Sequence, residues 1–335
     1  MPLTPNDVSV RKLVSDFLIA PRVSQQVLLA RELIPEVRAP LNSEFGKVPV
    51  GSAFRTSVDD DVNDQGVANI LDFETEFVTF DPKIRALKAV IPQRVVEAAQ
   101  EPFRPRAQSL GRVVNTLLLK YEKRTHDALN SGSFTAVAAT AAFGAAGDNP
   151  IGDLTARIKA VADACGMPPN TVVFGNDAWR RWRETSEVID RVKDAFGKTE
   201  MKDVTPGLAA TGSFLNIEDA PDFRVYVARS RHNTAKKGQT ATMVPIWTEN
   251  RVWIGCFDRN LPQKQTATVN RPAGSPGDMG DFEGVMSPII TTFGPRHGEQ
   301  REWIDPENGD MWMRVNWDYD QPVTETSCLQ ILTGA

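Results

Sequence analysis

The chain has 335 residues, of which 41% are hydrophobic and 24% are charged, and its formal net charge is −5. This length can bury a sizeable core, and this composition excludes a wholly disordered or fibrous chain. Because no positive excess is available to neutralise phosphates, the sequence also excludes a basic protein that wraps nucleic acid.

Residues 1–20 mix polar and apolar positions without a period and are interpreted as an arm. Ser24 is predicted to cap a short helix that continues to Leu33 and ends before Pro35. The arm has no continuous apolar stretch, and no segment of the chain approaches the roughly 18 apolar residues of a membrane span. We therefore expect neither a secretion signal nor membrane contact.

Residues 44–92 are predicted to form a long two-stranded ribbon around a polar tip. Strand-like residues occupy 71–80 and 85–92, and the acidic, turn-prone run 59–66 precedes them. Phe73 and Phe77 fall on one face of the first strand. Because a lone two-stranded ribbon is only marginally stable in water, we expect it to rest on another surface.

The strongest periodic pattern begins at Pro105 and continues to about Asn130. Apolar residues recur there in steps of three and four, which predicts a helix on the order of 40 Å long with one apolar face. The apolar positions are Leu110, Val113, Val114, Leu117, Leu118, Tyr121 and Leu129. The opposite, polar side is predicted to carry Arg112, Asn115, Lys120, Glu122 and Lys123.

The second half of the chain is predicted to alternate helix, strand and helix before turning to strands. Residues 136–147 are small and are interpreted as a connector. Asp153 is predicted to cap a helix that Gly166 closes, and a buried strand follows at 170–174. One helix then turns five apolar residues inward: Trp179, Trp182, Ile189, Val192 and Phe196. Later strands are predicted at 224–228, 241–247, 251–257, 289–293, 311–317 and 323–332. This order favours an α/β layer within a chain of the α+β class.

No pattern in the sequence indicates catalysis. The nucleophile elbow, the Walker A loop and the Rossmann glycine motif are absent, and residues 207–212 resemble a phosphate loop but lack its lysine. His126, His232 and His297 have no carboxylate or cysteine at metal-ligand spacing and are interpreted as solvated side chains. We therefore predict no enzymatic activity and no cofactor.

The three cysteines, Cys165, Cys256 and Cys328, are far apart in the sequence and form no C-x-x-C pair. This pattern predicts reduced, mostly buried thiols and synthesis in a reducing cytoplasm.

Residues 61–72 imitate a calcium-binding loop. Asp61, Asn63 and Gln65 occupy alternate positions, the central glycine is placed correctly, and Asp72 is the twelfth residue. However, the twelfth ligand in such loops is a bidentate glutamate, and a strand follows where the motif requires a helix. The preferred interpretation is an acidic, solvated tip that meets basic groups on a neighbour, and no metal is predicted.

Two further residue groups admit more than one interpretation. A basic cluster without interleaved aromatic residues is interpreted as a hairpin turn rather than a single-strand nucleic-acid site. It consists of Arg229, Arg231, Lys236 and Lys237. Tryptophans of the C-terminal third are interpreted as sheet packing or interface anchors, with a ligand pocket as the alternative. They are Trp247, Trp253, Trp303, Trp312 and Trp317.

The order of elements and one local segment resemble the HK97-type major capsid proteins of tailed bacteriophages. The segment reads GMPPNTVVFG at 166–175, followed by DAW at 177–179 and VIDRVK at 188–193. Many members of that family show a similar asparagine-threonine-valine strand after the first axial-domain helix, and then a helix with tryptophan. Residues 45–94 also resemble their extended loop. The likeness covers nearly the whole chain in element order, whereas the motif match is local and includes no catalytic residue.

The resemblance implies an HK97-like capsid fold with an N-terminal arm at 1–44 and an extended E-loop hairpin at 45–97. It further implies a peripheral domain with a long spine helix at 98–147 and an α/β axial domain at 148–285. Peripheral return strands are then expected at 286–324, and a C-terminal axial strand at 325–335.

The resemblance also implies self-assembly into hexamers and pentamers of an icosahedral virion shell. The shell would enclose double-stranded DNA without sequence-specific contacts, and a separate scaffold protein, a portal and a decoration protein are implied partners. Intersubunit contacts are predicted at Asp59, Asp60, Asp61, Asp64, Phe73 and Phe77. Some members crosslink covalently through an E-loop lysine. Here Lys47, Lys83 and Lys88 lie near the base of the loop and none lies at its tip, so crosslinking is not expected.

Three alternatives stay open at this point. A bacterial protein-shell nanocompartment of the encapsulin type would share the fold and differ in its contents. A soluble α/β ligand-binding protein or enzyme would form a small particle with a deep polar pocket. A tail or baseplate protein would form rings or tubes.

Overall fold

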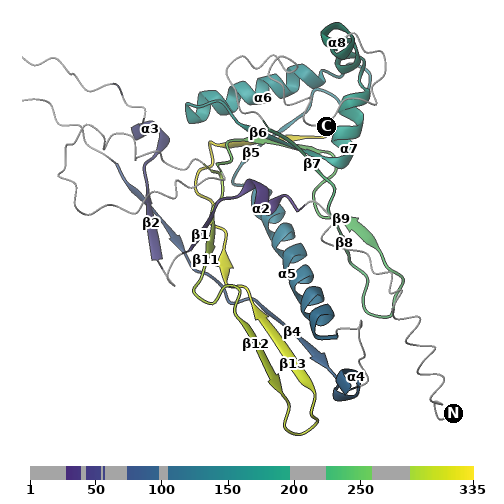
Figure 1. Ribbon diagram of the computed structural model, residues 1–335. Coiled ribbons are helices and arrows are strands. Elements are labelled where there is room, and N and C mark those ends of the chain that lie inside the picture. Colours follow the sequence, from purple (N-terminus) through teal and green to yellow (C-terminus); the bar gives the residue numbers. More distant parts are fainter. Residues whose placement is uncertain are drawn as a thin grey trace, which may run out of the picture.

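The computed structural model describes residues 28–38, 43–53, 56, 74–97, 105–196, 224–258 and 287–335. Within these ranges the fold is mixed α+β (Figure 1). The helices are α2 (Ala30–Leu33), α3 (Val50–Ala53), α4 (Gln93–Glu97), α5 (Pro105–Leu129), α6 (Pro150–Cys165), α7 (Asn176–Glu184) and α8 (Ser186–Phe196). The strands up to β7 are β1 (Glu36–Arg38), β2 (Ser43–Lys47), β3 (Glu76–Phe80), β4 (Ala86–Ile91), β5 (Thr135–Ala138), β6 (Thr171–Gly175) and β7 (Arg224–Ala228). The later strands are β8 (Arg231–Asn233), β9 (Met243–Pro245), β10 (Arg251–Gly255), β11 (Thr291–Phe293), β12 (Gln300–Ile304), β13 (Met311–Asn316), β14 (Tyr319–Asp320) and β15 (Leu329–Thr333).

A five-stranded sheet of order β5-β15-β10-β6-β7 forms the centre of the fold. Successive residues of β6 point to opposite faces, so Val172 and Phe174 pack on the side of α6 and α7, while Val173 packs with Trp253 on the other side. Because both faces are covered, β6 is buried at every position, and from Val172 onward its sequence is apolar rather than alternating.

The long helix α5 supports a second sheet of order β12-β13-β4 (Figure 1). The predicted apolar stripe is confirmed, because Val113, Leu117 and Tyr121 are buried and pack with Val315 of β13. The predicted bounds of this helix agree with α5 to within one residue at its C-terminal end. Local periodicity alone was sufficient to predict this helix, because most of its apolar stripe packs in one cluster with the second sheet.

The predicted ribbon of 71–80 against 85–92 is wrong. The strand β3 pairs with β2, with Lys47 opposite Glu76, and β4 pairs with β13 instead. The inward face of β4 carries Leu87 and Ala89, which pack in one cluster with the apolar stripe of α5, and Ile91, which packs with methionines of β13. Burying this apolar face separates β4 from β3, so the two-stranded hairpin consists of β2 and β3.

Three other local predictions need correction. The cap of α6 is Asn149, whose side chain accepts from Gly152 N at 3.1 Å, whereas Asp153 lies inside the first turn and accepts from Thr140. The single helix predicted over 176–196 is split at Thr185, which is extended and separates α7 from α8. The strands β1, β2, β5, β8, β12 and β14 were not predicted. By contrast, Gly166 closes α6 at a φ of 73°, as predicted.

Candidate functional site

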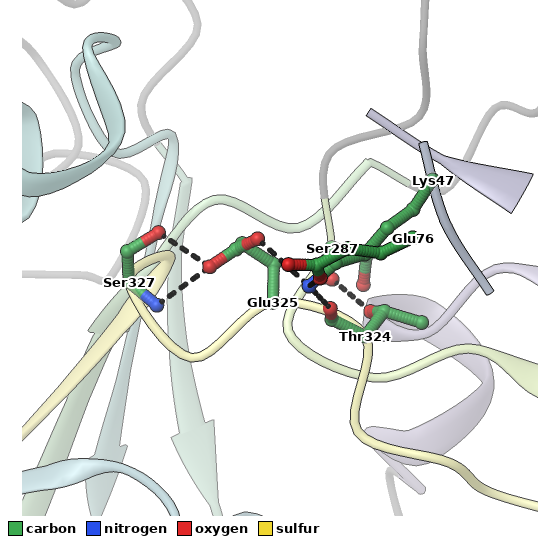
Figure 2. Close-up of polar contacts among 6 residues, drawn as sticks. All are labelled: Lys47, Glu76, Ser287, Thr324, Glu325 and Ser327. Carbon is green, nitrogen blue, oxygen red and sulfur yellow. Dashed lines mark hydrogen bonds and ion pairs between the residues drawn. The ribbon is translucent and has the colours of Figure 1, made fainter. Parts of the chain in front are cut away.

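The hairpin of β2 and β3 contacts the body of the fold through Lys47, at the end where its two strands lead into residues 48–75 (Figure 2). Lys47 is the last residue of β2, and its ammonium lies 3.2 Å from Glu76 Oε2 on the neighbouring strand. The same ammonium donates to Thr324 O at 2.8 Å and lies 3.3 Å from Glu325 Oε2. Three acceptors therefore match the three N–H donors of the lysine, and two of them belong to a segment about 280 residues away.

The acceptors on the body side are themselves held in place. Glu325 Oε1 accepts from the backbone N–H of Ser327 at 3.2 Å and from its hydroxyl at 2.8 Å. The hydroxyl of Thr324 donates to Ser287 O (Figure 2). The lysine thus meets a preformed turn, and anchoring the hairpin does not require this turn to order itself first.

The electrostatics of this contact keep both partners charged. Burial lowers the pKa of Lys47, but its hydrogen bonds and charge interactions with Glu76 and Glu325 outweigh burial and raise the pKa above 10.5. Burial raises the pKa of Glu325, but Ser327 and Lys47 together bring it below 4.5. A protonated ammonium has no lone pair for nucleophilic attack, so this lysine is suited to an ion pair rather than to covalent crosslinking.

An open cleft of about 650 Å³ lies beside this contact. It is lined by Lys47, Pro49, Val50, Gly51, Glu76, Asp163, Ala164, Gly166, Glu325, Thr326 and Ser327. Its walls are the Lys47–Glu76 end of the hairpin, the C-terminal turn of α6 and the turn before β15. Among the described residues, no group of three metal-ligating side chains is placed to hold a metal ion. In the same part of the chain, no helix is long and apolar enough to cross a membrane.

A buried carboxylate attaches the chain before β1 to the long helix. Glu122 of α5 is fully buried, and its two oxygens accept from Leu29 N at 2.9 Å and Ala30 N at 2.8 Å. It also accepts from Trp247 Nε1 at 2.6 Å. Burial raises the pKa of Glu122, while these hydrogen bonds act in the opposite direction. The carboxylate therefore joins α2, α5 and the segment before β10.

The prediction that Glu122 lies on the polar side of the helix is wrong. Leu118, Glu122, Thr125 and Leu129 form a row with steps of four, three and four, and Glu122, Thr125 and Leu129 are buried. This row flanks the main apolar stripe, so its spacing was a usable signal. The charge of Glu122 obscured that signal, because buried glutamates are rare unless they are paired.

The outer face of the β12-β13-β4 sheet carries aromatic and cationic side chains. Trp303 stacks on Trp312 with ring centroids 6.1 Å apart, and Trp312 is paired across the strands with Val90. Trp303 remains 42% exposed. The next cross-strand row consists of Arg301, Arg314 and Lys88, with Lys88 Nζ 4.3 Å from the ring centroid of Trp312. Arg301 also pairs with Glu299 at 2.7 Å.

The structure tests only part of the predicted contact set. Phe77 lies on β3 and is 68% exposed, which leaves it accessible to another surface. The remaining predicted contact and calcium-like residues lie outside the described residues and stay predictions. They are Asp59, Asp60, Asp61, Asn63, Asp64, Gln65, Asp72 and Phe73.

The prediction that the histidines are solvated side chains is wrong for His126 and His297. His126 Nε2 lies 3.1 Å from Thr248 Oγ1 and the ring meets Trp247 edge-on, and burial lowers its pKa below 6.5. His297 stacks on Phe293 with centroids 3.7 Å apart, and burial followed by two nearby arginines lowers its pKa to about 4. Both rings are therefore neutral near pH 7 and contribute to packing.

No protein-family model matches the sequence, and no curated protein sequence does. Similar solved structures exist. A phage-related protein from Bordetella bronchiseptica RB50 is 16% identical, with 92% of each chain covered and a TM-score of 0.61. The capsid structure of cyanophage P-SCSP1u is 10% identical, covering 96% of this chain and 94% of that one, with a TM-score of 0.55. The SrpI encapsulin of Synechococcus elongatus PCC 7942 is 10% identical, covering 99% and 96%, with a TM-score of 0.53.

Proposed function

We propose that this chain, which has the fold of HK97-type phage capsid proteins, is the major capsid protein of a tailed bacteriophage. The observation that carries the proposal is the likeness to a cyanophage capsid over more than nine-tenths of both chains. In this proposal the subunits form hexamers and pentamers of an icosahedral head that encloses double-stranded DNA. The chain acts by forming many contacts between copies rather than by catalysis. Each contact buries little surface and is weak, but every subunit makes several of them, so the shell is stable.

The divisions expected from the resemblance form part of the proposal. The hairpin β2–β3 would be the base of the E-loop (45–97), and α5 would be the spine helix of the peripheral domain (98–147). The helices α6 to α8 with β6, β7 and β10 would belong to the axial domain (148–285). The peripheral return strands (286–324) would include β12 and β13, and β15 would be the axial C-terminal strand (325–335). Residues 1–44 would be the arm.

We further propose that the acidic segment 59–64 contacts cations of an adjacent copy. The outer face of the β12-β13-β4 sheet offers Lys88, Arg301 and Arg314 next to half-exposed tryptophan. Opposite charges would steer copies together and make assembly sensitive to salt. A scaffold protein, a portal and a decoration protein would be separate partners.

Replacing Asp59, Asp60 and Asp61 by serine should lower the yield of particles while leaving the unassembled subunit folded. The physical reason is loss of complementary charge at a contact that each subunit repeats. Electron microscopy after gel filtration would count closed shells, and circular dichroism would check folding. A matched variant that removes three exposed carboxylates elsewhere should assemble normally: Glu97, Asp127 and Glu307. Wild-type yield from the first variant would contradict the proposed contact.

Replacing Lys47 by methionine should loosen the hairpin without unfolding the body. Because the lysine is partly exposed, we expect a loss of about 1 kcal/mol, or about five-fold faster amide exchange along β2 and β3. Hydrogen exchange with mass spectrometry measures this directly. Lys159→Met, which removes an exposed lysine of α6, is the control and should leave the exchange unchanged. Unchanged exchange in Lys47→Met would show that other contacts hold the hairpin.

The same exchange measurement has a definite pH dependence. The lowered pKa of Glu325 adds stability above pH 4.5, and this stability is lost as pH falls through the lowered value. The raised pKa of Lys47 adds stability below pH 10.5, and this is lost as pH rises through the raised value. After correction for intrinsic rates, hairpin exchange should therefore stay flat between about pH 5 and 10 and rise outside that window.

A protein-shell nanocompartment is the second candidate, because the solved encapsulin has a TM-score of 0.53 to this chain. Purified particles distinguish the two functions by their contents. Nuclease-protected double-stranded DNA supports a phage head, whereas an enclosed protein supports a nanocompartment. Tubes, rings or small monodisperse particles in the same micrographs would contradict both.

A further inference from the structure

The three cysteines, which are distant in sequence, meet next to residues that line the cleft. Cys165 is the last residue of α6, Cys256 follows β10, and Cys328 precedes β15. All three are free and buried. The Sγ atoms of Cys165 and Cys256 are 3.7 Å apart, and Cys256 N donates to Cys328 O at 3.0 Å.

We propose that Cys165 and Cys256 form a disulfide when the protein reacts with a hydroperoxide. This bond would fix the C-terminal end of α6, which lines the cleft, to the residue that follows β10. A disulfide has an S–S length of about 2.05 Å, so the two sulfur atoms need to approach by less than about 2 Å. Cys165 is the last residue of its helix, before the turn that Gly166 closes, so a small shift of one turn can supply this approach.

The reaction balances with hydrogen peroxide as the oxidant. The thiolate of Cys165 attacks one peroxide oxygen, forms a sulfenic acid and releases hydroxide, which is protonated to water. The sulfur of Cys256 then attacks the sulfenic sulfur, forms the S–S bond and releases a second water. Two thiols lose two electrons and two protons, and one peroxide becomes two waters. A small oxidant suits this buried pair, since a larger disulfide reagent would need the helix end to open.

The cysteine pair lies close to the contact of Lys47 with Thr324 and Glu325. Ala164 and Gly166, the neighbours of Cys165, line the cleft, and so does Ser327, which holds Glu325. The bond would link the helix layer to the sheet across 91 sequence positions. Linking distant positions restricts the unfolded chain, so the oxidised protein should be more heat-stable. A chain folded in a reducing cytoplasm would gain this lock in oxidising surroundings.

Treating the reduced full-length protein with hydrogen peroxide tests the inference. The intact mass should fall by two hydrogens, a non-reducing digest should link the peptides of Cys165 and Cys256, and Tm should rise by roughly 5–10 °C. Dithiothreitol should reverse all three changes. Cys165→Ser and Cys256→Ser should lose the response, while Cys328→Ser should retain it.

Several outcomes would overturn the inference: a mass gain of oxygen without a link, a link to Cys328, or a retained mass loss in Cys256→Ser. If a serine variant does not fold, the peptide map of the wild-type chain decides alone. These measurements do not depend on shell formation, so their failure is distinguishable from failure of the proposed capsid function.

Discussion

Replacing Glu122 by alanine should lower the free energy of unfolding by about 3 kcal/mol, because it leaves buried donors without an acceptor. The donors are the backbone N–H groups of Leu29 and Ala30 and the indole of Trp247. Each has a heavy-atom distance of 2.9 Å or less to the carboxylate, and alanine also leaves a cavity against α2. Urea unfolding of the unassembled chain measures the loss.

A graded series separates this effect from a general sensitivity of α5. Glu122→Gln retains one acceptor oxygen but turns an NH₂ group toward a donor, so its loss should be smaller than that of alanine. Lys123→Ala changes the exposed neighbour on the same helix and should cost under about 0.5 kcal/mol. Amide exchange at Leu29 and Ala30 should accelerate in Glu122→Ala before the rest of the fold opens. Equal stability of Glu122→Ala and wild type would refute the assigned role.

Replacing Gly175 by alanine should cost about 3 kcal/mol or more, because the added methyl group has no room. Its Cβ would lie 2.4 Å from Glu249 O and 2.5 Å from Thr248 O, both backbone atoms. The Glu249 carbonyl cannot retreat freely, since it accepts from Ala178 N at 2.8 Å and so satisfies the first turn of α7. The glycine is therefore required for close approach of two backbones, although its φ of −63° is ordinary.

Gly111→Ala is the matched control within the same chain. A Cβ at Gly111 in α5 would meet nothing within 4 Å, and alanine has the higher helix propensity. This variant should therefore gain about 0.5–1 kcal/mol. Parallel urea titrations of both variants should show opposite signs. A mild effect at Gly175 would mean that the 248–249 backbone can move away from β6.

The two variants also bear on assembly differently. Gly175 lies in the segment that resembles capsid proteins, and its role is to let α7 begin directly against the central sheet. Glu122 fixes the chain that precedes β1 to α5. If the proposed function holds, loss of either contact should reduce shell formation through misplaced subunit parts. Lys47→Met should instead leave the body folded and act on assembly only through the hairpin.

The sequence by itself determined the elements whose signal is local. The stripe of α5, the buried strand at β6 and the glycine that ends α6 depend on neighbours within a few residues, so periodicity and capping chemistry identify them. The same order of elements was enough to predict the capsid-like fold. The lysines at the loop base were also recognised, although without their partners. The acidic tip stays a prediction.

Only the tertiary structure decided which distant segments meet. Nothing local states that β3 pairs with β2 and not with β4, or that Lys47 reaches Glu325 across 278 positions. Glu122 is inside because three donors from other segments arrive to satisfy it, and a carboxylate without them would face water. Which strands pair, and which polar groups are buried, depends on the apolar surface that the whole chain buries. The apolar stripe of a helix depends only on residues within a few turns of that helix.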